Sequence, residues 1–356
     1  MSFIIVAGKE FRDHIQSKRF LIVFGILLLV VFLSLNDGLN EYNQRLDTYK
    51  AVVSRIQSTP QSNTPMPQKP SPLMIFYSML SYFTPIGAVL AISMGFDLIS
   101  KEKEEGSLKS LLSHPLFRDN VIVGKLLGAL GVFTIVIFIV TLICTGFLMM
   151  YGISPSGDEA SRIAAYMFFS LLFLISFFSI ALACSVIAPS SGLSVTYCIG
   201  IVIIVSFMLP ALGTAVATKV AGAQPNFADY GVIPGSQGSQ GLNNMTDAER
   251  QQMQERMDEY RNASQNYFQK VNSIERIFNI PAPDKSYEAI SRRVLTGSAS
   301  GRFFGGNFFR VGTNPSKPET LADSLGAVFS EIIALLILSV IALLVTYLRF
   351  MRLDIR

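Results

Sequence analysis

Charged residues are scarce in this sequence. Only 15% of the 356 residues are Asp, Glu, Lys or Arg, whereas soluble domains average about 25%. Half of the residues are hydrophobic, and many of them form runs long enough to cross roughly 30 Å of hydrocarbon as a helix. The composition excludes an ordinary soluble globular protein and predicts an all-α polytopic membrane protein.

Histidine and cysteine are also few, which restricts the chemistry that the chain can perform. His14 and His114 are the only histidines, and Cys144, Cys184 and Cys198 all fall in apolar runs. No Cys, His or carboxylate cluster has the spacing of metal ligands, and no Ser/His/Asp or Cys/His set suits nucleophilic catalysis. The phosphate-binding pattern G-x-x-x-x-G-K-[ST] is missing as well. We therefore expect no metal, no bound cofactor and no enzymatic activity in this chain. No basic patch is interleaved with aromatic residues, so nucleic acid is not expected as a partner.

Six apolar runs are long enough to span a bilayer. The fourth and fifth come from one uncharged stretch, Ile163 to Thr218, which the turn-forming sequence PSSG at 189–192 divides. The predicted transmembrane helices lie near 20–36, 73–97, 122–150, 163–187, 192–217 and 323–348.

Basic residues indicate which side of the membrane each loop faces. Clusters of them lie before the first span, between the second and third spans, and after the last span, and the positive-inside rule assigns such segments to the cytoplasm. The loop 37–72 also holds Arg45, Lys50, Arg55 and Lys69, and the segment 218–322 is basic too, but loops longer than about 60 residues count little in this rule. An even number of spans places both termini on that side. We therefore expect a cell-membrane protein with cytoplasmic termini and with residues 37–72, 151–162 and 218–322 outside. The basic residues that support this prediction are Lys9, Arg12, Lys18, Arg19, Lys101, Lys103, Lys109, Arg118, Arg349, Arg352 and Arg356.

The spans and loops predict five parts in chain order. At the start, residues 3–15 place apolar and charged side chains on different faces, which suits an amphipathic helix lying at the lipid headgroups. The five parts are an amphipathic elbow helix with the first span (1–36), an outer loop (37–72), the second to fifth spans with a cytoplasmic segment at 101–118 (73–217), an extracytoplasmic domain (218–322), and the last span with a cytoplasmic tail (323–356).

The extracytoplasmic segment 218–322 contains a strong helix signal. Thr246-Asp-Ala-Glu249 has the spacing of a capping box, and apolar residues then recur at alternating steps of four and three. This pattern predicts one helix over about 247–279 with a heptad seam, ended by the prolines that follow it. The seam packs either on the rest of this segment or on the same helix of a second subunit.

The stretch KEKEEGSLKSLLSHPLFRDNVIVGK runs from Lys101 to Lys125 and places dense charge between the second and third apolar runs. Gly106-Ser107 can begin a short helix that Pro115 ends. An apolar face flanked by charge is typical of a surface on which another protein docks, although a loop solvated at the lipid headgroups would have the same composition. The apolar face consists of Leu108, Leu111 and Leu112, and the acidic residues ahead of it are Glu102, Glu104 and Glu105.

This stretch resembles the sequence that follows the second span in ABC-2-type permeases, the membrane subunits of ABC exporters. The similarity rests on Ile99-Ser100-x-Glu102-x-Glu104-x-Gly106-Ser107-Leu108-x-x-Leu111-Leu112-Ser113-x-Pro115-x-x-Arg118, followed by Gly124-Lys125. Two weaker similarities lie near the chain ends: Gly8-Lys9-Glu10-Phe11-Arg12-Asp13 resembles the family's elbow helix, and Phe350-x-Arg352-x-Asp354-Ile355 resembles its cytoplasmic tail.

The resemblance implies a role for the charged stretch. In such exporters a coupling helix between the second and third spans docks in a cleft of a separate ATPase subunit, which holds ATP and Mg. Residues 101–118 would have that role here, and Gly106 would permit the sharp turn into the helix. The resemblance also implies a second permease subunit, as a homodimer in membrane lipid, and the export of a substrate. The residues do not identify that substrate, because a path lined with Phe, Leu and Ser would suit a lipid, a drug or a peptide-like molecule equally. The implied coupling residues are Glu102, Glu104, Gly106, Leu108, Leu111, Leu112 and Arg118.

A membrane protein that transports nothing is the alternative. Its outer domain would act mechanically on an external partner under the control of an ATPase, or it would be the ectodomain of a receptor.

Three residues within the spans are candidates for a transport path. Pro85 and Pro210 each remove a backbone hydrogen bond and should kink the second and fifth spans, although such kinks could serve packing alone. Glu331 would be a costly charge in lipid unless it faces protein or water. Alternatively, the last span starts later and Glu331 lies at the outer interface.

Overall fold

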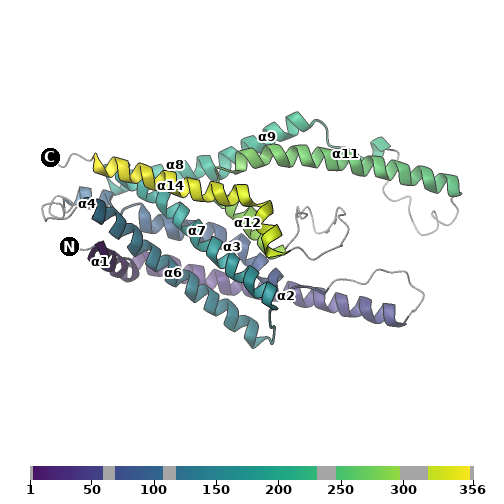
Figure 1. Ribbon diagram of the computed structural model, residues 1–356, viewed down its shortest axis with the longest axis horizontal. Coiled ribbons are helices and arrows are strands. Elements are labelled where there is room, and N and C mark those ends of the chain that lie inside the picture. Colours follow the sequence, from purple (N-terminus) through teal and green to yellow (C-terminus); the bar gives the residue numbers. More distant parts are fainter. Residues whose placement is uncertain (1–2, 59–68, 107–117, 231–245, 297–319, 353–356) are drawn as a thin grey trace. The chain divides into compact units, whose positions relative to one another are not determined.

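The computed structural model describes residues 3–58, 69–106, 118–230, 246–296 and 320–352. Within these ranges the regular elements are all helices (Figure 1), which confirms the predicted all-α class. The chain divides into two units, which are Met1–Ile201 with Pro283–Arg356 and Val202–Ala282.

Six helices in the described ranges are long and apolar enough to cross a membrane, which confirms the predicted number of spans. Each corresponds to one of the apolar runs in the sequence. In chain order they are α2 (Lys18–Ser58), α3 (Leu73–Gly95), α6 (Arg118–Met150), α7 (Gly157–Ile187), the continuous helix of α8, η1 and α9 (Ser191–Ala221), and α14 (Phe329–Met351).

The first of these helices is longer than its apolar run. α2 continues to Ser58, whereas the apolar run ends at residue 36 and predicts a loop over 37–72. Residues 39–58 contain neither proline nor glycine, and Arg45 Nη2 donates to Glu41 Oε1 one turn earlier at 2.7 Å. Both features favour continued helix. The polar extension was missed because hydropathy marks where the apolar run ends and not where the helix ends.

The last span begins later than predicted. A separate short helix, α13 (Leu321–Ala327), occupies the start of the predicted span 323–348, and a capping box between Thr320 and Asp323 begins it. α14 then starts at Phe329, so that Glu331 lies in its first turn. This placement agrees with the alternative in which the span starts later than the apolar pattern suggests.

α7 is the central helix of the larger unit. It packs against α3, α6, α14 and α12 (Pro283–Thr296), and most of its residues are buried. Tyr287 of α12 shares a 2.7 Å hydrogen bond with Ser170 of α7, and its ring stacks on Phe173 with centroids 4.4 Å apart. α12 comes from the predicted extracytoplasmic segment 218–322, yet its apolar stripe is buried in the unit that holds most of the spans.

The smaller unit is a helical hairpin. It contains the π-helical turn η1 (Ile203–Met208), α9 (Leu209–Ala221), the 3-10 turn η2 (Phe227–Tyr230) and α11 (Asp247–Asn279). α11 occupies the range over which the heptad spacing predicts a helix. α9 and α11 lie side by side (Figure 1), and a Cβ added at Gly213 would be 2.7 Å from Phe278 Cβ. Within the predicted segment 218–322, Tyr260 of the seam packs edge-on against Tyr230 with ring centroids 5.7 Å apart, as one of the two alternatives predicts. The contact of Phe278 with α9 was not expected, because Gly213 belongs to the predicted fifth span.

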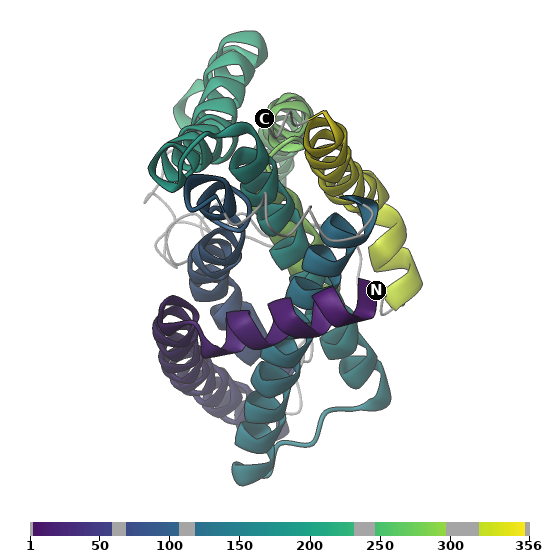
Figure 2. The ribbon, with the colours of Figure 1, turned by 90° about the vertical axis from the view of Figure 1, so that its left-hand side faces the viewer.

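The N-terminal helix α1 (Phe3–Gln16) lies across α6 (Figure 2). The two backbones approach closely because glycines of α6 face α1. A Cβ added at Gly124 would lie 2.6 Å from Val6 Cβ, and one added at Gly128 would lie 2.8 Å from Glu10 Cβ. Side chains larger than hydrogen at these positions would separate the two helices.

We predict that Gly128→Ala destabilises the protein although alanine is the better helix former. Overpacking against α1 is expected to cost about 1–3 kcal/mol, which exceeds the gain of roughly 1 kcal/mol in helix propensity. Gly146→Ala is the matched control, because it lies on the same helix and an added Cβ there meets nothing within 4 Å. Thermal unfolding of the purified chain should separate the two variants, and equal midpoints would contradict the close contact between α1 and α6.

Candidate functional site

The described start of segment 101–118 is a short helix. α4 (Ser100–Glu104) follows α3 after a brief turn, and Gly106 has a φ of 71°, a conformation that favours glycine. Leu108, Leu111 and Leu112 lie outside the described residues. Arg118 is the first residue of α6. The structure therefore describes how the predicted coupling segment begins.

A buried lysine connects α4 to two other helices. The Nζ atom of Lys125, on α6, donates to Glu102 Oε1 of α4 at 2.7 Å and to Glu10 Oε1 of α1 at 2.9 Å. Lys125 is 1% exposed and Glu10 is 6% exposed. We call these three residues the Lys125 cluster.

The Lys125 cluster fixes the positions of three elements that are far apart in the sequence. A buried ammonium loses its hydration and needs close carboxylates to offset that loss. Glu10 and Glu102 are like charges that would repel each other without the lysine between them. Each member therefore requires the other two, and α1, α4 and α6 are held together at this point.

The other charges of α4 bond the turn between α7 and α8. Lys103 Nζ donates to the carbonyl oxygens of Val186 and Ala188, the second at 3.2 Å. Glu104 Oε2 accepts from the N–H and hydroxyl of Ser191 at 3.2 and 3.1 Å. A cation thus lies at the C-terminus of α7 (Gly157–Ile187) and a carboxylate at the N-terminus of α8 (Ser191–Val202), where the helix dipoles favour each charge.

α7 in turn holds the start of α4. The hydroxyl of Ser185 accepts from the backbone N–H groups of Ile99 and Ser100, both at 2.9 Å. These N–H groups would otherwise lack a partner within the helix. The hydroxyl of Ser194 on α8 donates to the carbonyl of Phe96 at 2.5 Å. The end of α3 and the start of α4 are therefore bonded directly to α7 and α8.

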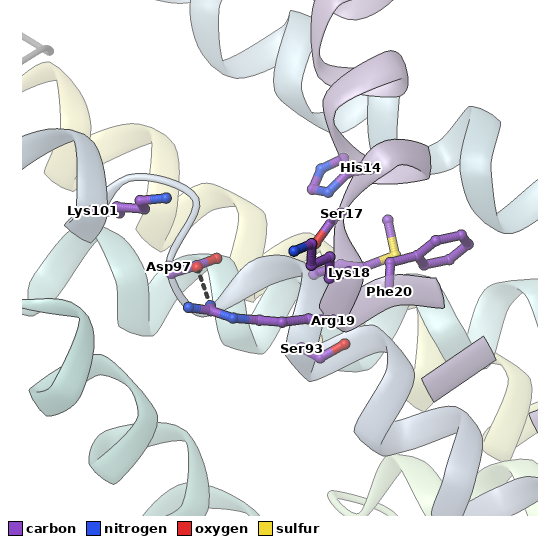
Figure 3. A pocket seen from close by; sticks show the side chains of 9 residues that line it. His14, Ser17, Lys18, Arg19, Phe20, Ser93, Asp97 and Lys101 are labelled. Atoms are coloured by element: carbon purple, nitrogen blue, oxygen red, sulfur yellow. Dashed lines mark hydrogen bonds and ion pairs between the residues drawn. The ribbon is translucent and has the colours of Figure 1, made fainter. Parts of the chain in front are cut away.

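A pocket of about 220 Å³ lies between the start of α2 and the end of α3 (Figure 3). Arg19 reaches across it, and its Nη1 atom donates to Asp97 Oδ2 at 2.6 Å. The Arg19 guanidinium also lies 5.6 Å from the centre of the Phe96 ring. The lining residues are His14, Ser17, Lys18, Arg19, Phe20, Ser93, Met94, Asp97 and Lys101.

His14 is the buried ionisable group of this pocket. It is 8% exposed, and its Nε2 atom has no hydrogen-bond partner among the described residues. Burial lowers the pKa of His14 below its usual value of 6.5, although the nearby charge of Glu10 acts in the opposite direction. The imidazole is therefore neutral at pH 7.

The structure assigns internal partners to two residues that the sequence predicts to contact an ATPase. Glu102 bonds Lys125, and Glu104 bonds Ser191. Whether either also contacts another subunit stays a prediction. The sequence pattern gave no role to Lys125, Glu10, His14 or Ser185. Lys125 had a usable signal, since a lysine inside the predicted span 122–150 needs buried partners.

The candidates within the spans lie on three different helices. Pro85 is inside α3, and Pro210 is near the start of α9, directly after the π-helical turn η1. Such a turn accommodates a proline, which cannot donate a backbone hydrogen bond. Glu331 is buried and accepts a 2.9 Å hydrogen bond from the Ser330 hydroxyl. None of the three is part of α4 or of the Lys125 cluster.

The helices and their connections define a multi-pass α-helical membrane protein. A family model described as "ABC-2 family transporter protein" matches residues 4–355, and the chain therefore belongs to this family. Membership implies a membrane subunit of an ABC transporter that associates with ABC ATPase subunits. No curated protein matches the chain.

We predict that Lys125→Met strongly destabilises the protein. It leaves the buried Glu10 and the partly buried Glu102 without their cation, and breaking a buried pair in this way costs about 3–5 kcal/mol. Glu10→Gln in the same background should recover part of the loss, because it removes one of the two repelling charges.

Lys50→Met is the control for this substitution. The Lys50 side chain is two-thirds exposed, and its Nζ atom lies 3.7 Å from Asp47 Oδ1. Removing this exposed charge should change the stability of the protein by less than about 0.5 kcal/mol. Thermal unfolding in detergent measures all three variants. A Lys125→Met protein as stable as the Lys50→Met protein would refute the structural role of the Lys125 cluster.

We predict that His14 makes the protein less stable in mild acid. Because its pKa in the folded chain lies below 6.5, the unfolded chain binds the proton first as the pH falls, and stability is lost below about pH 6.5. Between pH 7.5 and 5.5 the unfolding midpoint of His14→Gln should fall less than that of the wild type. His114→Gln serves as the control, and a wild-type slope in the His14→Gln protein would be the contrary result.

Proposed function

We propose that this chain is the permease subunit of an ATP-driven exporter and that segment 101–118 couples it to a separate ATPase. The ATPase would hold ATP and Mg, and two permease subunits would form a homodimer. The substrate would be a lipid, a drug or a peptide-like molecule. Family membership supports the transporter class, and the contacts of α4 support the coupling role.

The observation on which the proposal depends is the number of helices that α4 bonds. Glu102 reaches α6 through Lys125, Lys103 reaches the end of α7, and Glu104 reaches the start of α8. Through Lys125 the connection extends to α1. A solvated loop at the lipid headgroups has no need of such contacts.

These contacts provide a route for motion from the ATPase to the spans. A subunit that moves segment 101–118 would move α4, and α4 would take α6 and the turn between α7 and α8 with it. Interfaces of this kind switch between discrete packings and do not deform gradually. ATP binding and release would then alternate the spans between two arrangements.

Docking and transmission can be tested separately with two substitutions. Leu111→Asp places a charge on the predicted docking face, where losing a contact of about 2 kcal/mol would weaken binding about thirtyfold. This variant should lose the ATPase in a pull-down from native membranes.

Glu104→Ala removes the acceptor for Ser191 and is expected to lower the stability of the protein by only about 0.5–2 kcal/mol. It should retain the ATPase, while ATP hydrolysis by the complex no longer responds to the permease.

The control for Leu111→Asp is Gln57→Asp, which adds the same charge at the exposed end of α2. It should bring down the ATPase as the wild type does. If no ATPase accompanies the wild type, or if Leu111→Asp retains it fully, segment 101–118 is not a coupling segment. If Glu104→Ala behaves as the wild type in hydrolysis, the route through α8 is wrong.

The smaller unit supports a second candidate function, mechanical action on an external partner. α9 continues directly from η1 in the fifth span, and α11 has 33 residues, or about 50 Å of helix. A hairpin that continues from a span could transmit motion beyond the membrane. ATP hydrolysis that no candidate substrate stimulates, together with loss of function on shortening α11, would favour this alternative over export.

A further inference from the structure

The pocket at the start of α2 combines several features of a phosphate site. Lys18, Arg19 and Lys101 contribute positive charge to its lining, and Asp97 is the carboxylate among its lining residues. Asp97 is neutralised by Arg19, with which it pairs at 2.6 Å. Lys101 Nζ lies 3.8 Å from Glu105 Oε1 in an exposed ion pair, which offsets little of its charge. The lining residues of the pocket therefore remain positive overall.

The backbone adds donors to the same pocket. Ser17, Lys18, Arg19 and Phe20 all line it, and α2 begins at Lys18. The first N–H groups of a helix have no acceptors within the helix, and together with the positive end of the dipole they attract anions. Figure 3 shows Ser17 and Lys18 on one side of the pocket, with Asp97 and Lys101 opposite.

His14 provides the second, independent indication of a ligand. Its side chain is more than nine-tenths buried and lines the pocket, and its Nε2 atom has no partner in the described part of the chain. A buried polar atom without a partner is costly. Nε2 is closed off from solvent, so the imidazole would bond a ligand oxygen as an N–H donor once its ring turns toward the pocket.

The size of the pocket fits a phosphate group. Its volume of about 220 Å³ is several times the roughly 30 Å³ that one water molecule occupies. We expect the pocket to lie at the level of the lipid headgroups. Its residues Lys18 and Arg19 directly precede the first apolar run, and its residues Asp97 and Lys101 directly follow the second.

We infer that this pocket binds a phosphate group, presented by an anionic phospholipid whose headgroup lies at the start of α2. Lys18 and Lys101 supply the charge, the first N–H groups of α2 and the His14 imidazole supply hydrogen bonds, and Arg19 stays on Asp97. Basic pockets between transmembrane helices bind anionic headgroups in this way. Free phosphate has the same chemistry and is the second possible source.

The experiment compares lipid retention by the full chain in nanodiscs of phosphatidylcholine with and without phosphatidylglycerol. Native mass spectrometry after detergent extraction should find phosphatidylglycerol bound to the wild type. The Lys18→Gln/Lys101→Gln double variant should bind it on the order of twentyfold more weakly, because each lysine near an anionic surface contributes a factor of about five. Lys18→Arg/Lys101→Arg keeps the charges and should retain the lipid.

Two further measurements complete the test. The double variant Lys50→Gln/Lys270→Gln removes two charges outside the pocket and should leave retention unchanged. Inorganic phosphate is added to the detergent-purified chain, and the unfolding midpoint is measured. A rise that the Lys18→Gln/Lys101→Gln variant loses, without selective lipid retention, assigns the site to free phosphate. If that variant and the wild type agree in both lipid retention and phosphate response, the inference is overturned.

Discussion

The Lys125 cluster is the interaction on which the arrangement of the larger unit depends. An ammonium buried at 1% exposure requires both carboxylates, and these come from α1 and α4, while the lysine belongs to α6. α1 must therefore lie close against α6, which the glycines at 124 and 128 permit. α4 must also remain beside α6, and in that position Lys103 and Glu104 reach the ends of α7 and α8.

The fold was predictable where the signal is local, and much of the candidate site was not. Apolar runs predicted six spans, and a heptad pattern predicted the range of α11, because both follow from residues near one another in the sequence. The partners of Lys125 are different, since Glu10 is far from it along the chain and a glutamate in a basic amphipathic segment suggests a solvated face. α12 was missed as part of the larger unit because its short apolar stripe does not indicate what it packs against.

Contacts between residues far apart in the sequence also explain why charge is dense at the end of the second span. The sequence suggested that Glu102 and Glu104 face another protein, but in the structure each has a partner within the chain. The charges of α4 match the helix ends that they contact. Lys103 lies at the C-terminus of α7 and Glu104 at the N-terminus of α8, as the helix dipoles favour. Any docking of the segment would therefore depend mainly on its leucines, while the charges before them join the segment to the spans.

The Lys125 cluster and the pocket at the start of α2 share one helix. Glu10 and His14 are one turn apart on α1, so they lie on the same face, and the charge of Glu10 acts on the pKa of His14. Glu10 holds α1 to α6 and α4, while His14 lines the pocket together with Lys101, the residue before Glu102. If a headgroup binds the pocket only while α1 lies against α6, binding must stabilise that arrangement by an equal free energy, because such coupling is reciprocal. Any motion that separates α1 from α6 would then also weaken the hold on the lipid.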